Sequence, residues 1–301
     1  MALSVADIRN ALSDGLLSFP VTDFDASGRF NPDSYRERIE WFLEHDISAI
    51  FVAGGTGEFF SLVYEEFEQI VSIAVEVAGG KVPVIASAGR SISDARKYCA
   101  AAEAAGADGI LLMPPFLTEC PEEGTVQYAK AIMEASSLQF IYYNRGNGIL
   151  SAPSVEALAK ACPNLIGLKD GTGNIQQLND IIRTVGDRLV YVGGVPTAEI
   201  LAEAYLSIGV NTYSSAAFNF VPDLANRFYK ALRAGDAETV DTITRDFYLP
   251  LVRMRERKKG YAVSLIKAGV DIIGRPAGKT RAPLTMPSAE EYDELKAIIG
   301  K

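Results

Sequence analysis

Short apolar segments alternate with amphipathic segments along most of this chain. Eight apolar runs of four to six residues have the length and composition of buried strands. They occupy residues 16–21, 49–53, 82–87, 109–113, 140–143, 165–168, 189–192 and 210–213. A helical pattern follows each of them, at residues 31–44, after Ser61, and at 93–105, 121–136, 154–161, 174–185, 198–208 and 222–234. Eight strand–helix units at regular spacing favour an α/β fold of the closed (β/α)8, or TIM, barrel type over an open doubly wound sheet.

The pattern changes after this point. Residues 237–257, 260–268 and 288–299 predict helices with no strands between them. We therefore expect a barrel domain over residues 1–235 and a helical C-terminal extension over residues 236–301. The basic run at 253–259 is expected to be a solvated helix face. Lys267, in an apolar helix of the extension, is expected to form a structural ion pair within the extension.

Charge and composition narrow the function classes. The chain of 301 residues carries a formal net charge of −9, which argues against nucleic acid or an anionic membrane as a partner. No apolar run is long enough to span a bilayer, and residues 1–10 show no signal-peptide pattern. Three scattered cysteines fit a reducing cytoplasm. His45 is the only histidine, so neither a His-ligated zinc site nor a Ser-His-Asp triad is expected.

The strand at residues 165–168 ends in Lys169. In a barrel of this type, chemistry lies at the carboxyl ends of the strands. A lysine at that position would lose water from its amine, and desolvation lowers a lysine pKa and makes it a nucleophile for a ketone. The alternative is a lysine that extends from the strand end to solvent.

Other strand ends carry complementary groups. The turn at residues 54–58 is glycine-rich, and its backbone N–H groups can bind an anion. Tyr143 ends another strand and could relay protons to an imine-forming lysine. Taken alone, the turn could be a plain connection and Tyr143 a core aromatic. Their joint occurrence with Lys169 at one face of a barrel favours a catalytic site.

The three segments 54–58, 143–144 and 167–170 resemble signatures of the lysine-Schiff-base family of dihydrodipicolinate synthase and N-acetylneuraminate lyase. The order, the spacing and the two-part build also match. The resemblance implies that Lys169 forms an imine with a 2-oxo acid, that Tyr143 relays protons, and that the backbone of Gly55 and Thr56 holds the carboxylate. It implies that the Thr56 hydroxyl links to Tyr143. It also implies that no cofactor is needed and that the protein is a homodimer or a homotetramer.

Departures from the synthase pattern indicate another branch. Gly55 stands where the synthase has a threonine, and residues 114–119 lack the second relay tyrosine of the synthase. The synthase also has an arginine five residues beyond its tyrosine. That position is Gly148 here, whereas Arg145 lies two residues beyond Tyr143. The sequence is similar to the branch that dehydrates and decarboxylates 5-dehydro-4-deoxyglucarate. That substrate is a diacid, so a second anion site is needed. The candidates for substrate contacts beyond Gly55 and Thr56 are Arg145, Gly194, Ser214 and Ser215.

Two alternatives stay open at this stage. One is a Schiff-base aldolase that cleaves another 2-oxo sugar acid to pyruvate. The other is a barrel that only binds 2-oxo acids, although binding alone does not require a nucleophile such as Lys169. Residues 274–280 resemble a phosphate loop, but their spacing is one residue short and no strand precedes them.

Overall fold

A computed structural model describes residues 3–300 and shows a closed barrel of eight parallel strands. Neighbouring strands pair in chain order, and β8 closes the barrel against β1. The predicted fold class is therefore confirmed. The strands are β1 Leu17–Ser18, β2 Ala49–Val52, β3 Val84–Ala88, β4 Gly109–Leu112, β5 Gln139–Asn144, β6 Leu165–Asp170, β7 Val190–Gly193 and β8 Thr212–Ser215.

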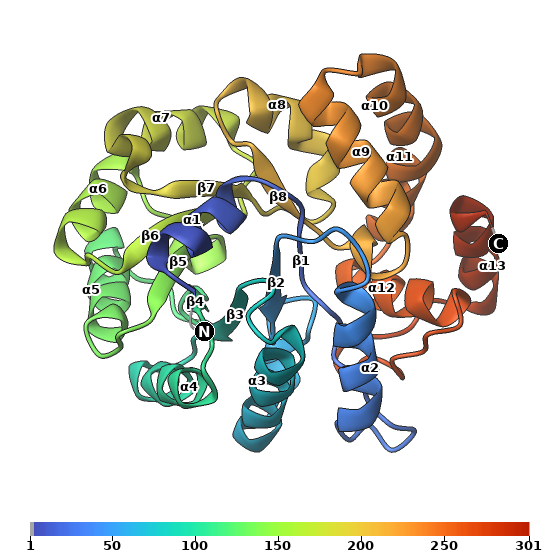
Figure 1. The fold of residues 1–301 in the computed structure, drawn as a ribbon, viewed down its shortest axis with the longest axis horizontal. Helices are drawn as coiled ribbons and strands as arrows, with labels where there is room; N and C mark the ends of the chain where they lie inside the picture. Colours follow the sequence, from blue (N-terminus) through green and yellow to red (C-terminus); the bar gives the residue numbers. More distant parts are fainter. Residues whose placement is uncertain (1–2, 301) are drawn as a thin grey trace.

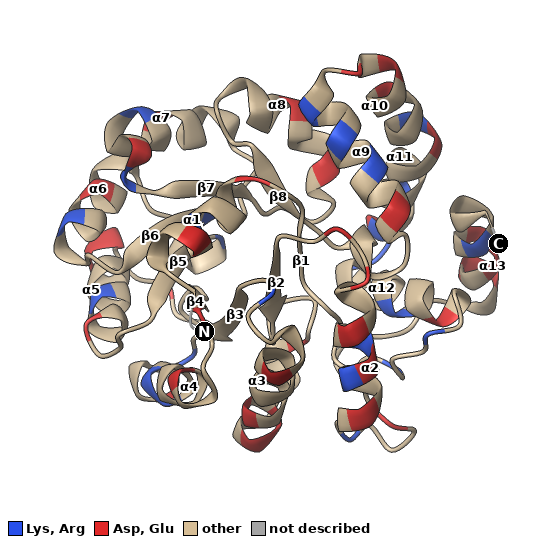
Figure 2. Ribbon diagram, viewed as in Figure 1, with Lys and Arg blue, Asp and Glu red and all other residues tan. Residues whose placement is uncertain are grey.

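An outer ring of helices surrounds the strands (Figure 1). Its members are α2 Pro32–Phe42, α3 Tyr64–Ala78, α4 Ile92–Ala105, α5 Glu122–Met133, α6 Ala152–Ala161, α7 Ile175–Val185, α8 Ala202–Ser207 and α9 Pro222–Ala234. Side chains at the N-caps start several of them, as Asn31 does for α2 and Ser91 for α4. Figure 2 shows acidic and basic residues along the solvated faces of helices such as α2, α6 and α9. Among residues 3–300, no helix is long and apolar enough to cross a membrane.

Helix α3 begins later than the sequence pattern predicted. Ser61 was expected to cap this helix, but residues 59–61 form a 3-10 turn and α3 starts at Tyr64. The reason is local. The Glu66 carboxylate accepts a hydrogen bond from the backbone N–H of Val63, at 3.1 Å. This bond gives a partner to an N–H group at the start of the helix that no helix carbonyl can bind, and so favours a helix that starts after Val63.

The N-terminal helix α1 (Val5–Ser13) was not predicted. Ser4 and Asp7 start it with a capping box. Ile8 and Leu12 are buried with the apolar side chains inside the barrel, and the Arg9 guanidinium donates hydrogen bonds to the carbonyls of Ile166, Asp187 and Arg188. In Figure 1 this helix lies across β5–β7. It therefore covers the amino-terminal opening of the barrel, the end at which β6 and β7 begin.

The helices after residue 236 gather on one side of the barrel, beside α2 and α9 (Figure 1). They are α10 Ala237–Ile243, the π-helical turn Thr244–Tyr248, α11 Leu249–Arg255, α12 Tyr261–Ile272 and α13 Ala289–Ile299. The Cβ of any larger residue at position 269 would lie 2.6 Å from the ring of Phe220, so Gly269 permits α12 to pack closely on the barrel. The predicted ion pair of Lys267 is confirmed, but its partner is Glu58 in the barrel.

Helix α1, which plugs the amino-terminal opening of the barrel, gives a prediction about stability. Leu12 is fully buried, and we expect Leu12→Ala to lower the free energy of unfolding by about 2–5 kcal/mol, because the substitution leaves a cavity inside the barrel. The matched control is Val5→Ala in the same helix, since Val5 is 44% exposed. Urea denaturation measures both variants. Equal effects of the two substitutions would show that α1 does not plug the barrel.

Candidate active site

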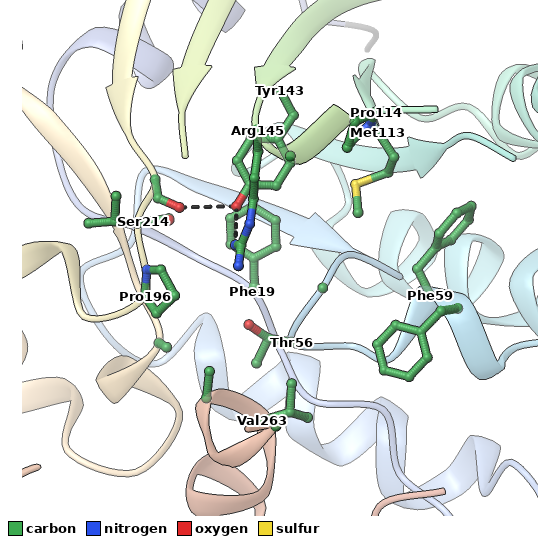
Figure 3. Close-up of a pocket in the computed structure, with 18 of the residues that line it drawn as sticks. Phe19, Thr56, Phe59, Met113, Pro114, Tyr143, Arg145, Pro196, Ser214 and Val263 are labelled. Carbon is green, nitrogen blue, oxygen red and sulfur yellow. Dashed lines mark hydrogen bonds between the residues drawn. The ribbon is translucent and has the colours of Figure 1, made fainter. Parts of the chain in front are cut away.

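A cavity of about 900 Å³ opens at the carboxyl ends of the strands. Residues from or just after several strands form its floor: Phe19, Thr56, Met113, Tyr143, Lys169, Gly194 and Ser214. The C-terminal extension forms another wall through Arg255, Tyr261 and Val263. Figure 3 shows that side chains from both parts of the chain point into the same space. Volumes of this order accommodate small organic ligands.

Lys169 lies at the end of β6, in register with Tyr143 on β5 and Val192 on β7. Only 5% of its surface is exposed, and its Nζ atom lies 4.4 Å from the ring centroid of Phe19 and 4.0 Å from that of Tyr143. Burial lowers the Lys169 pKa, Tyr143 opposes this effect and Arg145 adds to it. A larger fraction of the amine is therefore uncharged and nucleophilic than for an exposed lysine.

The path of the Lys169 side chain depends on Gly194. A Cβ atom at position 194 would lie 2.5 Å from Lys169 Cγ and 2.7 Å from Lys169 Cε. Such contacts are shorter than carbon atoms tolerate, so any other residue would displace the lysine. Gly194 was predicted as a substrate contact. The structure places it at the cavity and gives it this second role.

The Tyr143 hydroxyl lies between two partners. It donates a hydrogen bond to the Gly194 carbonyl at 3.1 Å and accepts one from Arg145 Nη1 at 2.8 Å. Burial opposes ionisation of the phenol, but the nearby charges of Lys169 and Arg145 outweigh burial and lower the Tyr143 pKa. A phenol with a lowered pKa beside an amine is suited to proton transfer. The expected link from Thr56 to Tyr143 is not among the hydrogen bonds of residues 3–300.

Arg145 extends from the loop after β5 into the cavity, below the Tyr143 hydroxyl (Figure 3). Within residues 3–300, no carboxylate lies within 4.0 Å of its guanidinium nitrogens. Arg145 thus places a cationic group in the cavity without a neutralising acid beside it. Such an arrangement attracts an anion.

The glycine-rich turn at residues 54–58 contributes Gly55 and Thr56 to the cavity wall. Gly54 and Gly55 are glycines for different structural reasons. A Cβ atom at position 54 would meet the Phe19 ring at 2.6 Å, so packing requires Gly54. A Cβ atom at position 55 has nothing within 4 Å. The fold does not demand glycine there, and its absence of a side chain leaves space for a ligand.

The side chains of the two predicted serines lie in different places. Ser214 lines the cavity, whereas Ser215 is fully buried outside it. The Ser215 hydroxyl donates a hydrogen bond to Glu199 at 2.5 Å and accepts one from the backbone N–H of Phe218. Consecutive strand residues point to opposite faces, so β8 can direct only one of the two hydroxyls into the cavity. The structure therefore brings Ser214, but not Ser215, to the cavity where substrate contacts were expected.

Arg255 was missed as a cavity residue, because the basic run that contains it was expected to be a solvated face. Its side chain is 18% exposed. It donates hydrogen bonds to the Pro196 carbonyl at 2.6 Å and to the Thr197 hydroxyl at 2.7 Å, and thereby holds the loop after β7. No pattern in the sequence distinguishes Arg255 from its basic neighbours, since its position depends on how α11 packs against the barrel.

The arrangement of a buried lysine, a tyrosine and a glycine-rich turn at one end of a barrel agrees with comparisons to known proteins. The model of the dihydrodipicolinate synthetase family matches residues 12–301. This chain belongs to the dihydrodipicolinate synthetase family. Its fold is similar to the crystal structure of dihydrodipicolinate synthase from Oceanobacillus iheyensis, with a TM-score of 0.90 and 25% sequence identity over 98% of each chain.

Two other proteins are much more similar in sequence. A protein of Acinetobacter baumannii named "Probable 5-dehydro-4-deoxyglucarate dehydratase" is 47% identical over 99% of this chain and 98% of its own length. A protein of Xanthobacter autotrophicus with the same name is 51% identical over 98% of this chain and 97% of its own.

The charges around Lys169 give a prediction about pH. Competitive labelling with a trace of acetic anhydride, followed by peptide mass spectrometry, reports the fraction of uncharged Lys169 amine at each pH. We expect the midpoint of the Lys169 titration, which is the pH at which half of the amine is uncharged, to lie below the ordinary lysine pKa of 10.5. Arg145→Leu removes a nearby positive charge, so protonation of Lys169 becomes easier and the midpoint moves to higher pH. Arg183→Leu, at an exposed position of α7, is the control. A midpoint that Arg145→Leu leaves unchanged or lowers would contradict this account.

Proposed function

We propose that the protein dehydrates and decarboxylates 5-dehydro-4-deoxyglucarate to 2,5-dioxopentanoate, carbon dioxide and water through a Schiff base on Lys169. The observation that carries the proposal is the buried Lys169 amine, which faces a cavity beside Tyr143 and the guanidinium of Arg145. The names of relatives that are about half identical over nearly the whole chain support the choice of substrate.

The substrate has two carboxylates, and the cavity offers two places for them. The carboxylate next to the ketone binds the backbone N–H groups of Gly55 and Thr56. The distal carboxylate and the hydroxyls lie toward Arg145 and Ser214, because a guanidinium can pair with a carboxylate through two hydrogen bonds. The open space at Gly55 leaves room for a six-carbon diacid.

The reaction starts when Lys169 Nζ attacks the C5 ketone and water leaves, which gives an iminium ion. The iminium acidifies C4, and loss of a C4 proton forms an enamine. The enamine expels the C3 hydroxyl, which leaves as water after it takes up a proton. Tyr143 is the group placed to accept and donate these protons, because its hydroxyl adjoins Lys169 and its pKa is lowered.

Decarboxylation uses the same electron sink. The conjugated iminium accepts the electron pair of the C1–C2 bond as carbon dioxide leaves, and the resulting dienamine carries an enol at C2. Uptake of protons at C3 and C4 converts the enol to an aldehyde, and hydrolysis of the imine releases 2,5-dioxopentanoate and the free amine. Both cleavages draw on the imine, so the proposed reaction uses no cofactor.

The remaining features of the proposal concern the setting of the enzyme. We propose a cytoplasmic homodimer or homotetramer that acts on a small 2-oxo sugar diacid and has no nucleic-acid or membrane partner. We also propose a domain boundary between residues 235 and 236, where α9 ends and the helices of the extension begin.

Product analysis tests the proposed function. Purified protein is incubated with 5-dehydro-4-deoxyglucarate, and carbon dioxide, 2,5-dioxopentanoate and pyruvate are quantified. We expect carbon dioxide and 2,5-dioxopentanoate in equal amounts, and a loss of about 10³-fold or more in turnover for Lys169→Arg, because a guanidinium does not form the imine. The control is Lys160→Met on the surface of α6. Pyruvate without carbon dioxide would assign the protein to the aldolases instead.

A further inference from the structure

The glycine-rich turn at residues 54–58 is held from behind by charges of the C-terminal extension. Lys267 of α12 places its Nζ atom 3.0 Å from Glu58 Oε1, and both side chains are fully buried. The backbone N–H of Arg281 donates a hydrogen bond to Glu58 Oε2 at 2.9 Å. Both carboxylate oxygens of Glu58 therefore contact the extension, although Glu58 itself belongs to the barrel.

Lys267 differs from Lys169 in its surroundings. Its Nζ atom donates hydrogen bonds to the carbonyls of Ala277 and Lys279 and lies 4.0 Å from the ring centroid of Phe24. Burial lowers its pKa to about 8, against the effect of Glu58. With a carboxylate, two carbonyls and a ring around it, this amine is a structural cation. Removing one partner of such a buried pair leaves an uncompensated charge and is strongly unfavourable.

The turn that this ion pair supports has an unfavourable backbone. Ala53 and Glu58, which bracket residues 54–57, have φ values of 50° and 59° in the left-handed region. Non-glycine residues in such conformations cost on the order of 1–3 kcal/mol each and persist only where their surroundings fix them. The Glu58 side chain is fixed between Lys267 and Arg281, and this contact supplies that constraint.

The conformation of Glu58 also closes the turn. Its N–H donates to the Gly55 carbonyl at 3.1 Å, and the N–H of Phe59 donates to the Gly54 carbonyl at 3.0 Å. These bonds fix the 54–55 and 55–56 peptide planes, which carry the N–H groups of Gly55 and Thr56. The directions of the N–H groups of Gly55 and Thr56, two residues that line the cavity, are therefore coupled to the side chain of Glu58.

We propose that Lys267 is a positioning residue for substrate binding: by holding Glu58 in its left-handed conformation, it orients the Gly55 and Thr56 backbone that receives the substrate carboxylate. Lys267 does not touch the substrate. The inference rests on the proposed function only in taking this backbone as the carboxylate site. The extension would thus contribute to substrate binding through Lys267, a residue that does not line the cavity.

The test uses pyruvate as the probe and the variant Lys267→Met, which keeps a long side chain and removes the charge. Adducts on Lys169 are trapped with borohydride over a range of pyruvate concentrations. We expect the half-saturating concentration to rise about tenfold or more, and the maximal trapping rate to stay within about threefold, because the amine itself is untouched. An unchanged half-saturating concentration in a folded variant would overturn the inference.

A matched variant separates positioning from general loosening. Arg275→Met removes the guanidinium that lies 4.7 Å from the ring centroid of Trp41; this contact joins the same extension to α2 of the barrel and involves neither Glu58 nor its two partners, Lys267 and Arg281. We expect it to lower the melting temperature and leave the half-saturating concentration of pyruvate unchanged. An equal rise in both variants would show that any weakening of the extension impairs binding, and the specific role of Lys267 would be wrong.

Two further measurements keep the test decisive. If Lys267→Met does not fold, Glu58→Gln decides, since it is isosteric and retains an acceptor for the Arg281 N–H. We expect a smaller rise in the half-saturating concentration of pyruvate, and no rise would overturn the inference.

A ligand-observed NMR titration with pyruvate in the Lys169→Ala background reports carboxylate binding without imine formation. Absence of trapping with 5-dehydro-4-deoxyglucarate in the unmodified protein would contradict the proposed function, whereas equal affinities for pyruvate with and without Lys267→Met in the Lys169→Ala background would contradict the positioning role.

Discussion

The withdrawal of the Lys169 amine from water is the constraint on which the site depends. Its Nζ atom lies near the rings of Phe19 and Tyr143, and Gly194 leaves free the space that its side chain occupies. Because burial disfavours the ammonium form, the same packing that completes the barrel end prepares a nucleophile. The cation of Arg145 strengthens this effect and also lowers the pKa of Tyr143. Packing, charge and proton transfer are therefore properties of one cluster.

The site is shared between the barrel and the C-terminal extension. The barrel supplies the amine, the phenol and the glycine-rich turn. The extension supplies part of the wall and reaches the barrel through Arg255, which holds the loop after β7, and through Lys267, which holds Glu58. The proposed boundary near residue 235 therefore follows the order of elements along the chain, whereas residues from both sides of it line the cavity.

Much of this arrangement could be predicted from the sequence, because the carboxyl ends of parallel strands meet at one end of a barrel. Locating the strands was enough to bring Lys169, Tyr143 and Arg145 to one cavity. The features that were missed depend on other information. Helix α1 has only a capping box and two buried apolar residues as its signal, and the side chain of Ser215 is directed by the alternation of β8. The position of Arg255 follows from tertiary packing of α11, which no local pattern encodes.

The central claim is that the buried amine of Lys169 carries the reaction as a covalent imine. The most direct test is to add borohydride during turnover of 5-dehydro-4-deoxyglucarate and to map the modified peptide by mass spectrometry. The account predicts a reduced adduct on the peptide that contains Lys169, and none on the peptide that contains Lys267, which among residues 3–300 is the other deeply buried lysine. Turnover that proceeds with no adduct on Lys169, or with the adduct on another lysine, would contradict it.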